Sequence, residues 1–203
     1  GHDPYSSSKG CAELLIASYR HSFFSDKGSA AIASARAGNV IGGGDWSENR
    51  LIPDIIRAFQ NNQPVKIRSP NAIRPWQHVL EPLSGYLLLA EKLFNKGNAY
   101  AEAWNFGPQM NDMKSVQVIV DIMAGYWEGA QWSIDQTESV HEAFSLKLDS
   151  SKAMEQLQWK PQWDLQQAIQ QTVTWYQAEQ QRANIATFCY EQIERYTSRL
   201  PQL

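Results

Sequence analysis

Tyr5 and Lys9 lie four positions apart in the segment Tyr5-Ser6-Ser7-Ser8-Lys9. If this segment is helical, the spacing places the phenol and the ammonium on one face of the helix. A neighbouring ammonium favours the phenolate, which suits a phenol to act as a general acid and base near neutral pH. Because the chain contains eight tyrosines, a Tyr-x-x-x-Lys spacing can arise by chance, and the pair alone is weak evidence for a catalytic site. Support must come from the elements around it.

The residues that follow the pair predict an α/β unit. Apolar side chains at helical spacing predict a helix over 10–24, which a turn at 26–29 ends. The nearly uncharged run of small residues over 30–41 is typical of a buried parallel strand. Gly42-Gly43-Gly44 comes directly after it, where the carboxyl ends of strands in open α/β sheets bind ligands.

The rest of the chain continues this pattern of helices and strands. Periodicity, caps and turns predict helices over 50–61, 81–96, 115–126, 165–181 and 183–200, and strands over 65–68, 77–80, 103–108 and 132–134. Asp164 is the predicted N-cap of the helix over 165–181, and Ser150 or Ser151 that of a shorter helix before it. The predicted class is therefore α/β.

Composition argues against several classes of function. The net charge is −3, with no basic stripe, so we expect no nucleic-acid surface. No apolar run reaches membrane-spanning length, and two cysteines fit a reducing compartment, so we expect a cytoplasmic protein without a membrane segment. The histidines and cysteines show no metal-ligand spacing, so we expect no metal site.

Three features of a dinucleotide-binding fold do not occur in the sequence. Such a fold needs an opening strand, a Gly-x-Gly-x-x-Gly turn at a helix N-terminus, and an acidic residue about 20 positions later. The glycines at 42–44 have the wrong spacing and follow a later strand. Either the chain has another fold, or it is the second half of this one.

Several motifs occur in the order and spacing seen in the extended short-chain dehydrogenases/reductases, the group of nucleotide-sugar epimerases and dehydratases. They are Tyr5-Ser-Ser-Ser-Lys9, Arg36-Ala-Gly-Asn39-Val-Ile-Gly-Gly-Gly-Asp-Trp46, Arg50-Leu-Ile-Pro-Asp54, Ile73-Arg-Pro-Trp-Gln-His-Val79 and Trp104-Asn-Phe-Gly-Pro108. The residues of the second and fourth motifs, and those of the segment 141–149, resemble the corresponding residues of the CDP-glucose 4,6-dehydratase branch of this group. The resemblance covers nearly the whole chain.

The resemblance implies a fold and a division of the chain. The fold would be the second half of a Rossmann-type parallel sheet plus a smaller, mainly helical substrate-binding domain. Residues 1–41 and 73–108 would remain from the dinucleotide-binding domain, and residues 42–72 and 109–203 would bind the sugar nucleotide. The chain would be a C-terminal fragment of an enzyme whose NAD fingerprint and dehydration acid and base lie upstream.

The resemblance also implies roles for single residues. Tyr5 and Lys9 would act in catalysis and contact NAD, with Tyr5 taking the proton of the sugar C4 hydroxyl. A guanidinium matches a diphosphate bidentately, which favours Arg74 as a substrate contact over a plain ion pair; Arg50 and Arg68 are weaker candidates for the same diphosphate.

Two more substrate contacts are expected from their position. Asn39, expected at a strand end, offers an amide for a phosphate or sugar oxygen, or is simply a turn residue. The resemblance places His141 near the nucleotide, where a plain surface histidine is an equal alternative.

Several alternatives stay open at this point. The intact protein is expected to be a lyase that dehydrates CDP-glucose, and the alternatives are another epimerase or dehydratase of the same fold, or a non-catalytic module that binds a sugar nucleotide. A homodimer is expected, because Leu14, Leu15 and Tyr19 suit an isologous helix contact, although they suit packing within the chain equally well. Neither the preference for cytosine nor a destination of the sugar in lipopolysaccharide follows from any residue.

Overall fold

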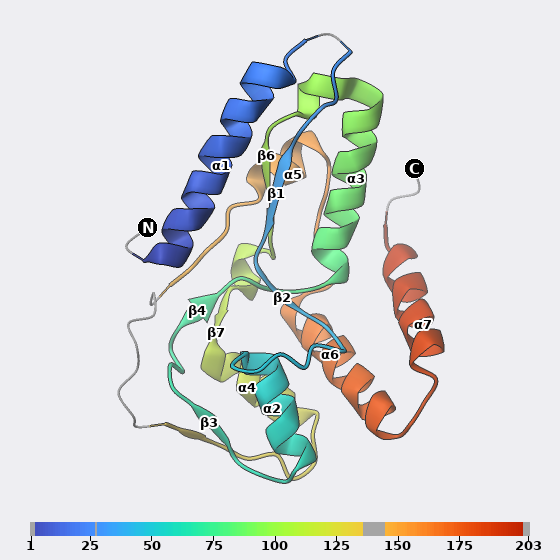
Figure 1. Cartoon of the computed structure of the whole chain (residues 1–203). Helices are drawn as coiled ribbons and strands as arrows, with labels where there is room; N and C mark the ends of the chain where they lie inside the picture. The colour runs from blue at the N-terminus through green and yellow to red at the C-terminus, as the bar shows by residue number, and fades with distance from the viewer. Residues whose placement is uncertain (1–2, 27, 136–144, 201–203) are drawn as a thin grey trace. The chain divides into compact units, whose positions relative to one another are not determined.

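The computed structural model of the chain describes residues 3–26, 28–135 and 145–200. Its helices and strands form two compact units, which we call unit 1 and unit 2 (Figure 1). Unit 1 comprises Gly1–Ala37, Leu83–Phe106 and Asp149–Lys160, and unit 2 comprises Gly38–Pro82, Gly107–Leu148 and Pro161–Leu203.

Unit 1 is built from helices and one pair of parallel strands. Its elements are α1 (Pro4–Phe23), β1 (Ser34–Ala37), most of α3 (Leu80–Lys96), a short 3-10 turn (Gly97–Tyr100), β6 (Ala103–Phe106) and α5 (Ser151–Gln156). β1 pairs with β6 in parallel, with Ser34 opposite Ala103 and Ala37 opposite Phe106. The core of the unit contains Leu89, Trp104, Phe106, Ala153, Leu157 and Trp159.

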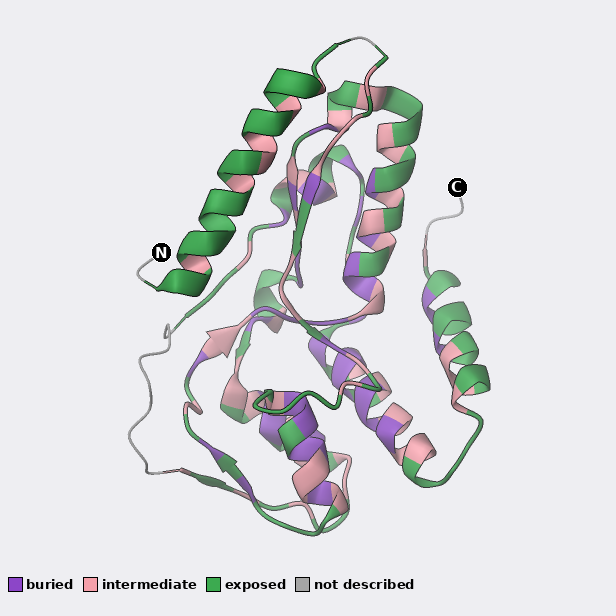
Figure 2. Cartoon of the chain, in the orientation of Figure 1, coloured by how far each residue is buried: buried purple, intermediate pink, exposed green. Residues whose placement is uncertain are grey.

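Helix α1 begins where it does because Asp3 caps it. The Asp3 side chain accepts a hydrogen bond from the Ser6 backbone N–H at 3.0 Å, and Pro4 occupies the first turn, where no backbone donor is needed. None of the helix residues is buried, and Figure 2 shows it exposed or intermediate along its length. Helix α1 therefore presents its side chains, including Tyr5 and Lys9, outside the core of unit 1.

Unit 2 combines short strand pairs with four helices of the described chain. Its elements are β2 (Asn39–Ile41), α2 (Leu51–Gln60), β3 (Val65–Ile67), β4 (Ile73–Arg74), β5 (Trp76–His78), a 3-10 turn (Met110–Asp112), β7 (Lys114–Ser115), α4 (Val116–Gly125), β8 (Trp132–Ile134), α6 (Leu165–Gln180) and α7 (Ile185–Thr197). The pairs β2–β5 and β3–β8 are parallel, and β4–β7 is antiparallel.

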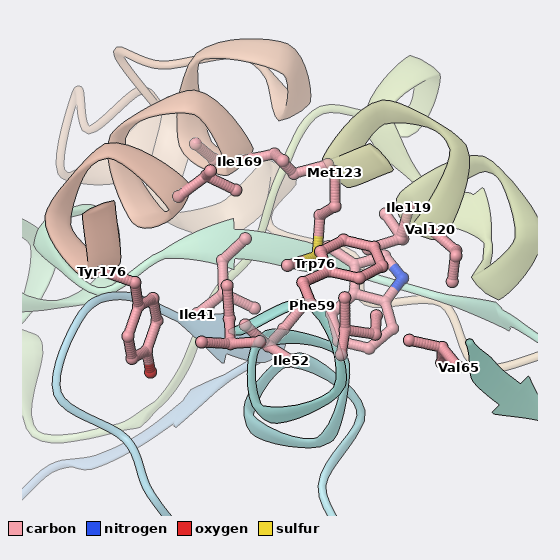
Figure 3. Close-up of a cluster of buried hydrophobic side chains, with 14 of the residues drawn as sticks. Ile41, Ile52, Phe59, Val65, Trp76, Ile119, Val120, Met123, Ile169 and Tyr176 are labelled. Atoms are coloured by element: carbon pink, nitrogen blue, oxygen red, sulfur yellow. The ribbon is translucent and has the colours of Figure 1, made fainter. Parts of the chain in front are cut away.

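The larger core lies in unit 2, where α2, α4 and α6 pack against the short strands (Figure 3). Trp76 of β5, Phe59 of α2 and Met123 of α4 are among its buried side chains. Tyr176 of α6 lies at the edge of this cluster in Figure 3. Helix α6 starts at the predicted residue, since Asp164 forms a capping box with Gln167.

The predicted fold class is confirmed: the chain is α/β, with parallel strand pairs of the Rossmann type. The strand predicted over 30–41 was wrong in extent, because it is two short strands separated at Gly38. A side chain at Gly38 would place its Cβ 2.3 Å from the Pro75 carbonyl oxygen, and the chain turns there from β6 to a new partner, β5. Burial was also overestimated, since Ser34 is the one buried residue of β1.

The pair β4–β7 was not predicted. Each strand has two residues, too few for an alternating pattern to be read from the sequence. The functional division at 1–41 and 73–108 against 42–72 and 109–203 stays a prediction, and the compact units divide the chain at other residues. Among the described residues, no helix is both long and apolar enough to cross a membrane.

Candidate functional site

Tyr5 and Lys9 lie together in the first turns of α1, as the spacing predicts. The Lys9 Nζ atom lies 5.4 Å from the centroid of the Tyr5 ring, which is a cation–π contact. Tyr5 is 72% exposed, so its hydroxyl is open to a ligand. The Ser8 hydroxyl donates to the Tyr5 backbone carbonyl at 2.7 Å, and none of the described residues forms a hydrogen bond with the Tyr5 phenol oxygen. The two side chains form an accessible pair on one helix face within unit 1.

The pairing of β2 with β5 in unit 2 places Asn39 opposite Trp76, two residues after Arg74 of β4. Asn39 is the first residue of β2, opposite Trp76, and its backbone N–H donates to the Pro75 carbonyl at 2.8 Å. It therefore lies beyond the end of β1 and begins the next strand. Arg74 is half-buried, and its guanidinium donates to the Ile73 carbonyl at 2.9 Å. This contact holds the Arg74 side chain back along its own strand.

Arg50 and Arg68 begin and end other segments of unit 2. Arg50 occupies the N-cap position of α2, and its guanidinium lies 3.4 Å from the Asp45 carboxylate. Arg68 follows β3 and is exposed. Burial opposes the ionisation of Asp45, but hydrogen bonds from Ser47 and the charge of Arg50 outweigh it and lower the pKa of Asp45. Asp45 is therefore a carboxylate at neutral pH.

The remaining predicted contact, His141, lies outside the described residues. Among the residues that are described, no group of three or more His, Cys, Asp and Glu side chains could hold a metal ion.

A buried carboxylate at the start of α3 was missed by sequence reasoning. Glu81 is fully buried and accepts hydrogen bonds from the backbone N–H groups of Gln162 and Trp163 and from the Tyr196 hydroxyl. Burial raises its pKa, and the hydrogen bonds from Trp163, Tyr196 and Gln162 reduce that rise. Within unit 2, the Glu81 carboxylate connects the first turn of α3 to the segment before α6 and to α7.

His78 is a second buried polar residue of unit 2. Its Nδ1 atom accepts a hydrogen bond from the Leu80 backbone N–H at 3.3 Å, and its ring packs edge-on against Trp163 with centroids 4.8 Å apart. Burial lowers its pKa to about 4, so the imidazole is neutral at physiological pH. His78 is therefore a residue of the core.

The family model described as NAD dependent epimerase/dehydratase family matches residues 2–107, which include the Tyr5–Lys9 pair, both parallel partners of the 30–41 segment, and the Gly42-Gly43-Gly44 run. The chain belongs to this family.

A curated relative of the family is CDP-glucose 4,6-dehydratase of Salmonella typhimurium. It is 53% identical over 183 residues, which cover 88% of this chain and 51% of the relative. The chain thus spans about half the length of this relative.

Solved structures of family enzymes share the fold. A dTDP-glucose 4,6-dehydratase from Bacillus anthracis in complex with NAD matches with a TM-score of 0.67 and 19% identity, over 90% of this chain and 54% of that one. A UDP-glucuronic acid 4-epimerase from Bacillus cereus, in complex with UDP-glucuronic acid and NAD, matches with a TM-score of 0.71 and 20% identity, over 86% and 52%. At these identities the likeness concerns the fold.

Proposed function

We propose that the protein containing this chain is an NAD-dependent lyase that converts CDP-glucose to CDP-4-keto-6-deoxyglucose. The observation that carries the proposal is the exposed Tyr5–Lys9 pair at the start of α1, in a chain that is 53% identical over 183 residues to a CDP-glucose 4,6-dehydratase. The reaction consists of oxidation at C4, loss of water across C5 and C6, and reduction at C6.

Tyr5 is the acid and base of the oxidation. Its phenolate oxygen takes the proton of the C4 hydroxyl, and the exposed phenol gives a sugar room to approach. The C4 ketone acidifies the C5–H bond, so the C5 proton can pass to a general base while the C6 hydroxyl takes a proton from a general acid and leaves as water. The Lys9 ammonium lies on the same helix face, over the Tyr5 ring, where it can contact the same ligand.

The residues present fit one end of NAD. The accessible Tyr5 and Lys9 side chains are suited to contact the nicotinamide ribose, whereas a Gly-x-Gly-x-x-Gly turn for the pyrophosphate does not occur among the 203 residues. When bound, NAD supplies the hydride acceptor and donor of the reaction. This chain's own residues move the hydroxyl proton and bind the sugar nucleotide.

The substrate contacts are Asn39, Arg50, Arg68, Arg74 and His141. Arg50 is the best supported of the described set, because it is 67% exposed in its side chain and has a charged partner that fixes it. A guanidinium has several N–H donors, so Arg50 can bind a diphosphate while it keeps its contact with the Asp45 carboxylate.

The test is an assay of the full open reading frame that contains these residues, supplied with CDP-glucose and, in parallel, dTDP-glucose. Alkaline ultraviolet absorbance reports the 4-keto-6-deoxy sugar. We expect Tyr5→Phe to nearly abolish turnover while CDP-glucose still binds. Tyr190→Phe is the matched control, since Tyr190 is similarly exposed at 68% but lies on α7. Retained turnover in Tyr5→Phe would contradict the catalytic role.

The same assay separates the alternatives. Product from CDP-glucose alone supports both the dehydratase chemistry and the cytidine preference. Silence with both substrates favours another epimerase of the family, which an exchange assay at C4 of UDP-sugars would detect, or a module that binds a sugar nucleotide without turnover. Calorimetry with CDP and NAD distinguishes the last case, because a binding module takes up CDP alone.

We also propose that the intact protein is a cytoplasmic homodimer that uses α1 as its contact. The apolar side chains Leu14, Leu15 and Tyr19 are 74%, 59% and 53% exposed, so packing within the described chain does not account for them. Two copies of one helix face form an isologous contact. Sedimentation of the intact protein should give a dimer, and a purely monomeric species would contradict this.

A further inference from the structure

Gly43 and Gly44 of the glycine loop, residues 42–47, lie against the indole of Trp175 in unit 2. A side chain at Gly43 would place its Cβ 2.0 Å from the Trp175 Cγ atom. At Gly44, where φ is +80°, a Cβ would lie 3.4 Å from the far edge of the same ring. Position 43 therefore admits no side chain while Trp175 keeps this place.

Tyr176 and Arg57 hold the loop from two other sides. The Tyr176 hydroxyl donates to the Asp45 carbonyl at 2.7 Å, and its ring packs edge-on against Trp46 with centroids 5.1 Å apart. Burial raises the pKa of Tyr176 to about 12, so this hydroxyl stays a donor throughout the physiological range. Arg57 donates to the Trp46 carbonyl at 3.0 Å and to the Ser47 carbonyl at 3.1 Å, and pairs with Asp54.

The loop in turn holds Arg50. The Asp45 carboxylate accepts from the Ser47 backbone N–H at 3.0 Å and pairs with the Arg50 guanidinium at 3.4 Å. Between them the chain turns at Asn49, whose φ of 61° is left-handed, a conformation that asparagine tolerates better than most residues. A displacement of the loop would therefore move the carboxylate that orients Arg50.

We infer that Trp175 is a positioning residue for sugar-nucleotide binding: it sets the glycine loop, through which Asp45 aims Arg50 at the diphosphate. The inference rests on the proposed function for its ligand. Trp175 lies on α6 and is distant in sequence from the motifs at 5–9, 36–54, 73–79 and 104–108. A displaced guanidinium loses most of its charge-assisted contact, because that contact depends on direction and distance.

The test is a double-mutant cycle between Trp175→Ala and Arg50→Gln in the full-length enzyme. We expect each single variant to raise KM for CDP-glucose about tenfold, with kcat within about threefold, since each removes binding that substrate and transition state share. Because both act on one contact, the double variant should also show about a tenfold rise, whereas independent effects would multiply to about a hundredfold.

Two further variants control for a purely structural role. Trp127→Ala removes a similarly half-buried tryptophan of the same unit, whose ring packs on Phe59 and not on a glycine of the loop, and KM should stay at the wild-type value. As a single variant, Gly43→Ala should raise KM, because its Cβ collides with the indole. In the Trp175→Ala background the same change should cause no further rise in KM. If Trp175→Ala acted through a general loss of stability, Trp127→Ala should also raise KM. The effect of Trp175→Ala on KM would then multiply with that of Arg50→Gln.

The outcomes separate this inference from the proposed function. Wild-type turnover of CDP-glucose with multiplicative effects of Trp175→Ala and Arg50→Gln overturns the positioning role and leaves the dehydratase standing. If CDP-glucose is not turned over, calorimetry with CDP-, UDP- and dTDP-glucose runs the same cycle on Kd, because all three carry the diphosphate. Failure of the wild type to bind any of the three contradicts both proposals.

Discussion

Replacement of Glu81 by alanine should destabilise the protein severely, because its carboxylate has three donors from two other segments. In Glu81→Ala, the N–H groups of Gln162 and Trp163 and the Tyr196 hydroxyl all lose this acceptor. At about 1 kcal/mol or more for each buried donor, with a cavity in addition, the loss is about 3–5 kcal/mol. This is a large part of the roughly 5–15 kcal/mol that stabilises a typical domain.

Glu81→Gln separates the hydrogen bonds from the charge. The amide keeps one oxygen for Gln162 and Trp163, and the Tyr196 hydroxyl can turn to accept from the new NH2 group, so we expect a loss of only about 1 kcal/mol. Urea unfolding of the full-length protein measures both variants. Glu91→Ala, an exposed change on the same helix, should leave the midpoint unchanged.

The difference between wild type and Glu81→Gln should also depend on pH. Burial raises the pKa of Glu81 above its ordinary value of 4.5. The folded state therefore binds the Glu81 proton more tightly than the unfolded state does. The contribution of this proton to the free energy of unfolding is fully present below the ordinary pKa of 4.5. It decreases as pH rises from the unfolded pKa through the folded one, by at most about 1.4 kcal/mol per pH unit, and stays constant above.

Hydrogen exchange locates the effect. In Glu81→Ala the amides of α7 should exchange faster than in wild type, because the bond from Tyr196 to Glu81 is one of the attachments of that helix. The reasoning is refuted if Glu81→Ala costs less than about 1 kcal/mol, or equals Glu81→Gln, since the carboxylate would then not be the acceptor that these donors depend on.

Two further changes test the packing and the caps. Gly85→Ala places a Cβ 2.2 Å from the Phe106 ring and should cost about 1–3 kcal/mol in urea unfolding, whereas Gly125→Ala, with open space around it, should be neutral or slightly stabilising. Asp164→Ala removes the capping box that it forms with Gln167 and should cost about 1 kcal/mol, measured in the same way.

The sequence predicts helices well where local signals mark both ends. Asp164 and Gln167 satisfy the capping-box pattern, and α6 begins at the next residue. At the other end of a helix, Gly97 follows α3 with φ of +58°, a conformation for which glycine is favoured. These signals act within a few residues, so a single sequence contains all the information that they need.

Breaks that depend on distant partners are not predictable in this way. The small-residue run over 30–41 has no local signal to end a strand at Ala37, since Gly38 is compatible with strand or turn. What decides is the close approach of the Pro75 carbonyl, 37 positions further on. The same holds for Asn39, which was expected to end a strand and instead begins β2.

The candidate site likewise contains one relation that local spacing predicts and one that depends on residues distant in sequence. Tyr5 and Lys9 could be found from the sequence because their relation is a helical spacing, and a helix converts that spacing directly into a shared face. No sequence spacing predicts the contact between Gly43 and Trp175. A glycine run indicates only that side chains are excluded there, and a tryptophan on an amphipathic helix usually belongs to the core. It takes the packed structure to show that each occupies the space the other leaves. If Trp175 positions Arg50, the arginine that we propose to bind the substrate depends on a helix more than a hundred residues later in the chain. Substitutions in α6 that preserve hydrophobicity but change side-chain shape should then alter KM before they alter stability.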